Sequence, residues 1–226
     1  MKKLLALAST LALAAPAIAQ VQITEWMYGG NSGEYVEFTN LGPSAVDFTG
    51  WVYDDDSRFS TVASGGFSLS AFGIVRAGES VLITESSAAT FRTNWSLPAT
   101  VKVLGGYTNN LGRADEINLF NASGTLVDRL TYGDAVYAGT IRTQTAAGLP
   151  VSLAALAPQT VAPGNWVLAA TTDSYGSRMA TSGDVGNPGL FTLAPVPEAE
   201  TWAMLLAGLG LVGAIARRRR TTAGAR

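Results

Sequence analysis

The chain of 226 residues contains no cysteine and no histidine. These absences exclude a Ser-His-Asp triad, a Cys-His nucleophile pair and a histidine-based zinc site, because each needs an imidazole or a thiol. They also exclude disulfide bonds, although a domain of this size buries a core large enough to fold without them. Any catalysis would therefore have to rest on carboxylates.

Charged residues are also scarce, at 14 % of the chain against an average of about 25 %. Glycine is frequent, with 25 copies, and this balance suits an exported all-β domain better than a helical cytosolic one. Residues 20–193 hold eight basic and 15 acidic side chains, a net charge of −7. Such a domain is repelled by phosphate backbones, so nucleic acid is not expected as a partner.

The first 19 residues have the pattern of a removable signal peptide. Lys2 and Lys3 precede an apolar run over 4–15, and the small residues Ala17 and Ala19 follow. This order predicts export, with cleavage by signal peptidase after Ala19.

The last segment, 194–226, contains 16 uncharged residues over 201–216. As a helix they would span about 24 Å at about 1.5 Å per residue, somewhat less than the roughly 30 Å hydrocarbon core. The pattern predicts a transmembrane helix with the preceding domain outside, because a basic cluster after the helix stays in the cytoplasm. The cluster consists of Arg217, Arg218, Arg219 and Arg220.

This tail resembles the PEP-CTERM sorting signal. The resemblance is carried by Val196, Pro197 and Glu198, by the apolar stretch after them and by the arginine cluster. It implies recognition and cleavage by an exosortase, a membrane cysteine protease. It also implies a Gram-negative bacterium that makes exopolysaccharide.

Between the two ends, short runs of β-forming residues alternate with turn clusters, which predicts a sandwich or a small barrel. Tyr35–Thr39 shows the alternation clearly, with Val36 and Phe38 on one face and three polar or aromatic residues on the other. The expected strands are Val21–Tyr28, Tyr35–Thr39, Trp51–Tyr53, Val81–Thr84, Val101–Leu104, Ile117–Phe120 and Leu126–Tyr132.

The central region, 20–193, resembles a lamin-tail domain. The match is densest in Ile23–Tyr28, Gly33–Asn40 and Val46–Trp51, and it continues to a closing turn at Gly183–Gly189. The resemblance implies an immunoglobulin-like β-sandwich that acts as an interaction or structural module. The stretch 135–165 matches it only loosely.

Carboxylates are the remaining candidates for chemistry. A glycosidase needs two of them about 5–9.5 Å apart across a sugar cleft, and Glu25, Glu34 and Glu37 are the nearest candidates. The competing interpretation is that they accept hydrogen bonds from loop amides or pair with arginine. A calcium site could likewise form from Asp54, Asp55 and Asp56, but consecutive residues point to alternate sides, and a solvated turn is the alternative.

Exposed aromatic side chains could stack on sugar rings. Most tryptophans in a sandwich lie in its core, and Trp95 is the expected exception because polar residues precede it. The aromatic candidates are Trp26, Trp51, Trp95, Trp166, Tyr28 and Tyr53.

Taken together, these features predict an exported, non-enzymatic protein without a cofactor. It would be anchored briefly in the inner membrane and then reach the cell surface or the extracellular matrix. The expected ligand is exopolysaccharide or a matrix protein. The alternatives are a carboxylate-dependent glycan hydrolase and a calcium-stabilised adhesin.

Overall fold

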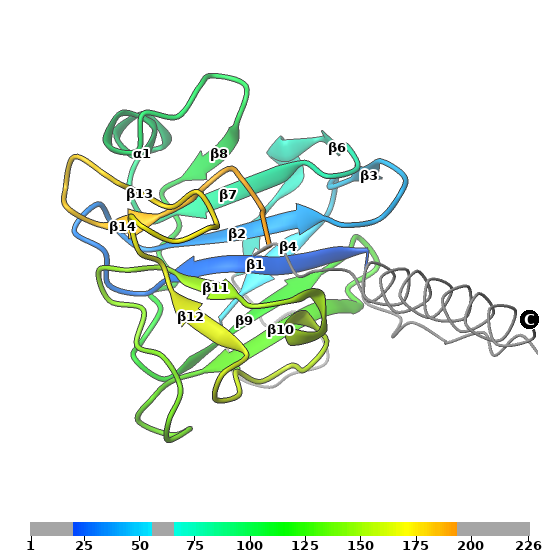
Figure 1. Cartoon of the computed structure of the whole chain (residues 1–226). Helices are drawn as coiled ribbons and strands as arrows, with labels where there is room; N and C mark the ends of the chain where they lie inside the picture. Colours follow the sequence, from blue (N-terminus) through cyan, green and yellow to red (C-terminus); the bar gives the residue numbers. More distant parts are fainter. Residues whose placement is uncertain (1–19, 56–65, 194–226) are drawn as a thin grey trace, which may run out of the picture. The chain divides into compact units, whose positions relative to one another are not determined.

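The computed structural model describes residues 20–55 and 66–193. These residues form two main β-sheets (Figure 1), which confirms the expected all-β class. In spatial order, the larger sheet contains β12 (Trp166–Leu168), β11 (Gly148–Pro150), β1 (Val21–Met27), β2 (Tyr35–Asn40), β7 (Ser80–Thr84) and β8 (Lys102–Gly105). The smaller sheet contains β10 (Leu126–Tyr132), β9 (Asp115–Phe120), β4 (Val52–Asp54) and β5 (Phe67–Ser68).

Short elements complete the described part of the chain. Neighbouring strands in the two main sheets run antiparallel except for the β7–β8 pair, which is parallel. The remaining elements are the pair β3 (Val46–Asp47) and β6 (Ile74–Val75), the pair β13 (Arg178–Met179) and β14 (Val185–Gly186), the helix α1 (Ala88–Asn94), and the 3-10 turns η1 (Ser70–Phe72) and η2 (Leu153–Leu156).

The seven strands expected from the sequence are confirmed as β1, β2, β4, β7, β8, β9 and β10. Strands β11 and β12 were missed, because each has only three residues and shows no clear alternation. Gly148 of β11 lies against the Trp26 ring, where an added Cβ would come within 2.5 Å of a ring carbon. Gly148 is therefore needed for β11 to pack closely on β1. The spacing of apolar residues in the sequence does not reveal this need.

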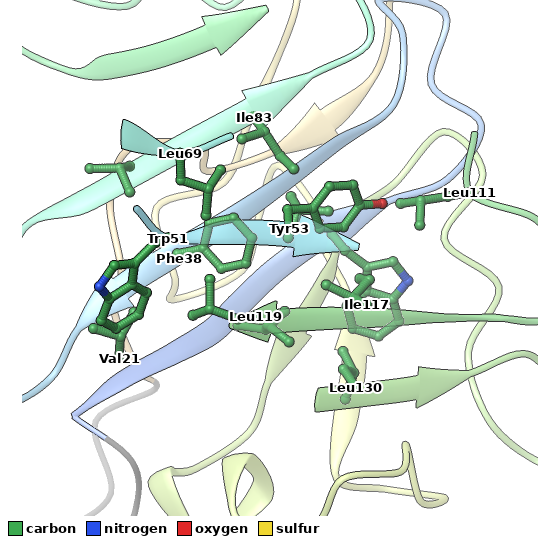
Figure 2. Close-up of a cluster of buried hydrophobic side chains, with 14 of the residues drawn as sticks. Val21, Phe38, Trp51, Tyr53, Leu69, Ile83, Leu111, Ile117, Leu119 and Leu130 are labelled. Atoms are coloured by element: carbon green, nitrogen blue, oxygen red, sulfur yellow. The ribbon is translucent and has the colours of Figure 1, made fainter. Parts of the chain in front are cut away.

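Apolar side chains of the two main sheets meet in one core (Figure 2). Phe38 and Ile83 come from the larger sheet, and Tyr53, Ile117 and Leu119 from the smaller one. All five are fully buried. Burial of each side chain of this size contributes about 1.5–3 kcal/mol, so this core accounts for the pairing of the two sheets.

Strand β2 is buried on both of its faces. Val36 and Phe38 belong to the core, as the alternation indicates. On the other face, Tyr35 packs against Phe91 of α1 with ring centroids 5.2 Å apart, and Glu37 binds the Gly189 amide. Helix α1 and the segment 178–192 therefore cover the outer face of this strand, and we call 178–192 the closing segment.

Candidate functional site

Glu25 and Glu37 lie on neighbouring strands, as the hydrolase hypothesis requires. The β1–β2 pairing sets them opposite each other, and each is only 1 % exposed. Glu25 Oε1 accepts hydrogen bonds from the Tyr35 hydroxyl at 2.6 Å and from the Asn187 amide at 2.8 Å. Glu37 Oε2 accepts one from the Gly189 amide at 2.7 Å. Both carboxylates thus accept hydrogen bonds from loop amides, as expected if these residues have a structural role and not a catalytic one.

The closing segment lies directly on this carboxylate pair. A Cβ placed on Gly186 would come within 2.6 Å of Glu25 Oε1, so only glycine fits there. The protein's own backbone occupies the space where a sugar would have to bind. This geometry favours the competing interpretation of Glu25 and Glu37, because burial under the closing segment separates both carboxylates from solvent.

Burial also changes the protonation of the pair. It raises the pKa of Glu25 well above the usual range, and the nearby charge of Glu37 raises it further. Burial raises the pKa of Glu37 as well, against hydrogen bonds from Thr24 and Gly189 that lower it. Two facing carboxyl groups in a dry environment disfavour double ionisation. Their arrangement suits a clamp that holds the closing segment on the sheet.

Glu34 has a similar structural role at the start of β2. Its Oε2 accepts hydrogen bonds from the Leu111 amide at 2.8 Å and from the Tyr107 hydroxyl at 3.3 Å. Burial raises the pKa of this carboxyl to about 7. Glu34 therefore stabilises the loop that follows β8. It does not lie in one site with Glu25 and Glu37.

The Asp54–Asp56 run does not form a solvated turn at its first residue. Asp54 ends β4, is buried and lies opposite Asn118 of β9. Asp55 accepts a hydrogen bond from Asn109 Nδ2 at 2.9 Å, and Asp56 lies outside the described residues. Within 20–55 and 66–193, no group of three or more acidic side chains is placed to hold a metal ion.

The expectation that Trp95 is exposed is wrong, because its side chain is 1 % exposed. Ser87 caps the start of α1 by accepting a hydrogen bond from the Thr90 amide, and Trp95 caps its end. The indole packs edge-on against Tyr35 at 5.8 Å and also contacts Phe91. The polar residues before Trp95 lie on the more exposed side of the helix, whereas Trp95 itself faces β2.

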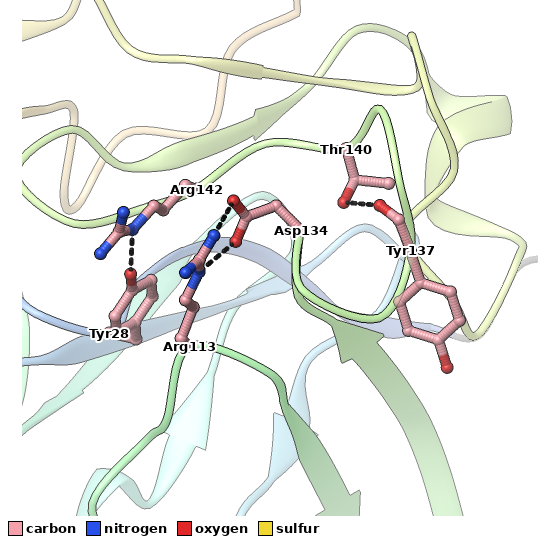
Figure 3. Close-up of polar contacts among 6 residues, drawn as sticks. All are labelled: Tyr28, Arg113, Asp134, Tyr137, Thr140 and Arg142. Carbon is pink, nitrogen blue, oxygen red and sulfur yellow. Dashed lines mark hydrogen bonds and ion pairs between the residues drawn. The ribbon is translucent and has the colours of Figure 1, made fainter.

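Tyr28 is the one residue of the six aromatic candidates that is not buried. Its ring stacks on Tyr132 with centroids 6.4 Å apart, and its hydroxyl accepts a hydrogen bond from Arg142 Nε at 2.9 Å. Beside it, Arg113 donates two hydrogen bonds to Asp134, at 2.8 and 2.7 Å. Figure 3 shows these side chains close to one another. We call Tyr28, Arg113, Asp134 and Arg142 the Tyr28 cluster.

A cavity of about 260 Å³ lies close to the Tyr28 cluster. Tyr132 belongs to both places, because it lines the cavity and also stacks on Tyr28. The other lining residues are Ala114, Asp115, Glu116, Thr131, Val136 and Tyr137. The loop that follows β10 therefore contributes to both the cavity and the cluster.

Sequence reasoning singled out Tyr28 but missed its three partners. Arg113 lies on the loop between β8 and β9, whereas Asp134 and Arg142 both lie on the loop between β10 and β11, at or beyond the end of the clear family pattern.

The expected export and sorting residues lie outside the described part of the chain. These are Ala17, Ala19, Val196, Pro197, Glu198 and Arg217 to Arg220. The apolar helix expected over 201–216 falls there too. In the segments that are described, no helix has the length and apolar character needed to cross a bilayer.

Comparison with protein families identifies both parts of the chain. Residues 195–220 match the PEP-CTERM protein-sorting motif, and residues 14–134 match the Lamin Tail Domain. The second match covers β1 through β10 and more than half of the chain, and it ends before the closing segment. No curated protein matches the sequence significantly. The chain belongs to the lamin tail domain family and carries a PEP-CTERM sorting motif at its C-terminal end.

Proposed function

We propose that this protein is a non-enzymatic interaction module that is exported, sorted by an exosortase and delivered to the cell surface or the extracellular matrix. The observation that carries the proposal is the sorting motif at 195–220, which directly follows a β-domain of the lamin-tail family. Both matches are to non-catalytic domain types. In its delivered form the domain would bind exopolysaccharide or another matrix protein.

The proposal divides the chain into three parts: a signal peptide over 1–19, an immunoglobulin-like sandwich over 20–193 and a sorting tail over 194–226. The compact unit ends at Leu193 and the next unit starts at Ala194, which supports the second boundary. The apolar helix over 201–216 would hold the precursor in the inner membrane until cleavage. Signal peptidase and the exosortase are then its partners during export.

The buried carboxylates also support a binding role. Glu25, Glu34 and Glu37 each accept hydrogen bonds from backbone amides of the same domain. They stabilise loops and do not face a substrate cleft. What the domain offers to other molecules is its surface, where the Tyr28 cluster gathers two arginines, a carboxylate and a tyrosine.

The sorting step is tested by changing the motif and leaving the rest of the tail intact. In producing cells, Glu198→Gln should leave the protein as an uncut membrane species, because the exosortase would no longer recognise the motif. Glu200→Gln is the matched control, since it removes the same charge two residues further along. Immunoblots of membrane, surface and medium fractions read the result. Identical distribution of the two variants and the wild type would contradict the proposal.

A further inference from the structure

We propose that the Tyr28 cluster binds the carboxylate-bearing sugar residues of an acidic polysaccharide. This inference rests on the proposed function and gives the interaction module a ligand class and a site. The ligand is a sugar ring with a carboxylate attached to it, as in a uronic acid.

The first argument is the free hydrogen-bonding capacity of Arg142. Two other basic residues form ion pairs within the domain: Lys102 pairs with Glu79 at 3.2 Å, and Arg129 with Glu116 at 3.2 Å. Arg142 is exposed, and within the described part of the chain Nε is the only nitrogen of its side chain that forms a hydrogen bond, the one to the Tyr28 hydroxyl. Its two terminal nitrogens are therefore available to an incoming acceptor. A guanidinium group binds a carboxylate through two parallel hydrogen bonds.

The second argument is the charge of the cluster. Arg113 and Asp134 form a two-point pair on the surface, and the Arg113 side chain is 48 % exposed. Arg142 also helps to hold the pKa of Asp134 below its usual range, although the Arg113 hydrogen bond does more. Two guanidinium groups thus surround one carboxylate, which leaves the cluster with one excess positive charge. In a domain with a net charge of −7, this is a local site for an anion.

The third argument is that buried aromatic rings support the cluster on its inner side. Tyr132 supports Tyr28, is itself buried, and donates a hydrogen bond to the Gly112 carbonyl at 3.0 Å. Trp26 packs against Tyr132 with centroids 5.3 Å apart. Since the Tyr28 hydroxyl accepts from Arg142, its own hydrogen can be donated to a ligand. A site fixed in this way loses little entropy when a ligand binds.

The geometry favours a sugar over an acidic peptide. The Tyr28 hydroxyl and Arg142 Nε are 2.9 Å apart, so the ligand must place an apolar surface and a carboxylate close together. A uronic acid meets this need, because its carboxylate is attached directly to a ring whose C–H face can lie on an aromatic side chain. Aspartate and glutamate carry their carboxylates on flexible chains without such a face.

The test uses the full-length protein in detergent and three probes: a polygalacturonate oligosaccharide, its methyl ester and poly-glutamate. Calorimetry should show binding of the acid form, at least tenfold weaker binding of the methyl ester, and weaker binding at high salt. Arg142→Gln should weaken binding of the acid form at least tenfold, and Tyr28→Phe should weaken it several-fold. Arg76→Gln is the matched control, because Arg76 is exposed and lies near β6, on a different loop.

Three results would overturn the inference: equal binding of acid and ester, wild-type affinity in Arg142→Gln, or poly-glutamate binding as strong as that of the sugar. Unchanged thermal unfolding of Arg142→Gln excludes a folding defect, since the side chain is exposed. The sorting experiment with Glu198→Gln is independent of these measurements. A failure of sugar binding with intact sorting rejects the site and leaves the proposed function standing.

Discussion

Two regions of this domain use their charged groups in opposite ways. Beneath the closing segment, Glu25 and Glu37 are buried and accept hydrogen bonds from backbone amides. In the Tyr28 cluster, Arg113 and Arg142 lie near the surface, and much of their hydrogen-bonding capacity remains open to solvent. Buried charge serves the fold here, whereas exposed charge remains available to a partner.

The difference follows from the cost of desolvation. A buried carboxylate is tolerated only where it is hydrogen-bonded or protonated, so each one fixes the segment that supplies its donors. An exposed guanidinium stays hydrated and contributes little to stability. Substitutions in the first region should therefore change stability, and substitutions in the second should change binding.

The largest loss of stability is expected from Trp95→Ala. The indole is fully buried between α1 and Tyr35, and truncating an aromatic side chain of this kind costs about 3–5 kcal/mol. Leu153→Ala is the control, because Leu153 is 46 % exposed. Urea titrations of both variants measure the difference. Equal midpoints would show that the outer face of β2 is not part of the stable core.

A pH-dependent loss of stability comes next, and Asp128 is one of its sources. Burial raises the pKa of this carboxyl from its usual 3.8 to about 7, although its Oδ2 accepts a hydrogen bond from the Ile23 amide at 2.7 Å. The folded state therefore binds more protons than the unfolded chain between about pH 4 and pH 7, and stability falls as pH rises through this window.

Between pH 5 and pH 8, Asp128 alone should lower the free energy of unfolding by about 2–4 kcal/mol. Asp128→Asn keeps an oxygen acceptor for Ile23 and cannot ionise, so it should make the profile less steep. Asp47→Asn should not, because Asp47 is exposed and hydrogen bonds from Thr49 lower its pKa. Chemical unfolding at several pH values tests this. An equally steep profile in Asp128→Asn would assign the dependence to other groups.

Gly186→Ala should destabilise the closing segment by about 1–3 kcal/mol, the usual cost of overpacking. The added methyl group would collide with Glu25 Oε1. Gly29→Ala is a suitable control, since the nearest atom to its Cβ would be 3.4 Å away. Hydrogen exchange of the Asn187 and Gly189 amides reports on the segment directly. If both variants protect these amides equally, the carboxylate clamp does not hold the loop.

The sequence allowed seven strands to be predicted because short runs of β-forming residues are separated by turn clusters. It did not show that β2 is covered on both faces. That coverage depends on α1 and on the closing segment, which lie about 50 and 150 residues further along the chain. Trp95 was misjudged for this reason: the polar residues before it lie on the more exposed side of a short helix.

The Tyr28 cluster could be predicted only in part. An aromatic residue at the end of β1 was recognised as a candidate ligand contact, but its partners lie on two loops that come next to it only in the folded domain. Arg142 lies 114 residues from Tyr28, and no local pattern links them. Glu25 and Glu37, by contrast, were both among the three carboxylates that the sequence offered as candidates, and the pairing of β1 with β2 sets these two opposite each other.

The smallest effect on stability is expected from Asp134→Asn, together with a gain in binding. Both members of the Arg113–Asp134 pair are solvent-accessible, and such pairs contribute little to folding. Removing the carboxylate frees Arg113 for the ligand, so the affinity for polygalacturonate should rise several-fold while thermal unfolding stays unchanged. Asp47→Asn controls for the general loss of one negative charge. A fall in affinity would mean that Asp134 itself contacts the ligand. The binding surface would then include a carboxylate as well as the two arginines, and exposed acidic groups would have to be counted among those that serve binding.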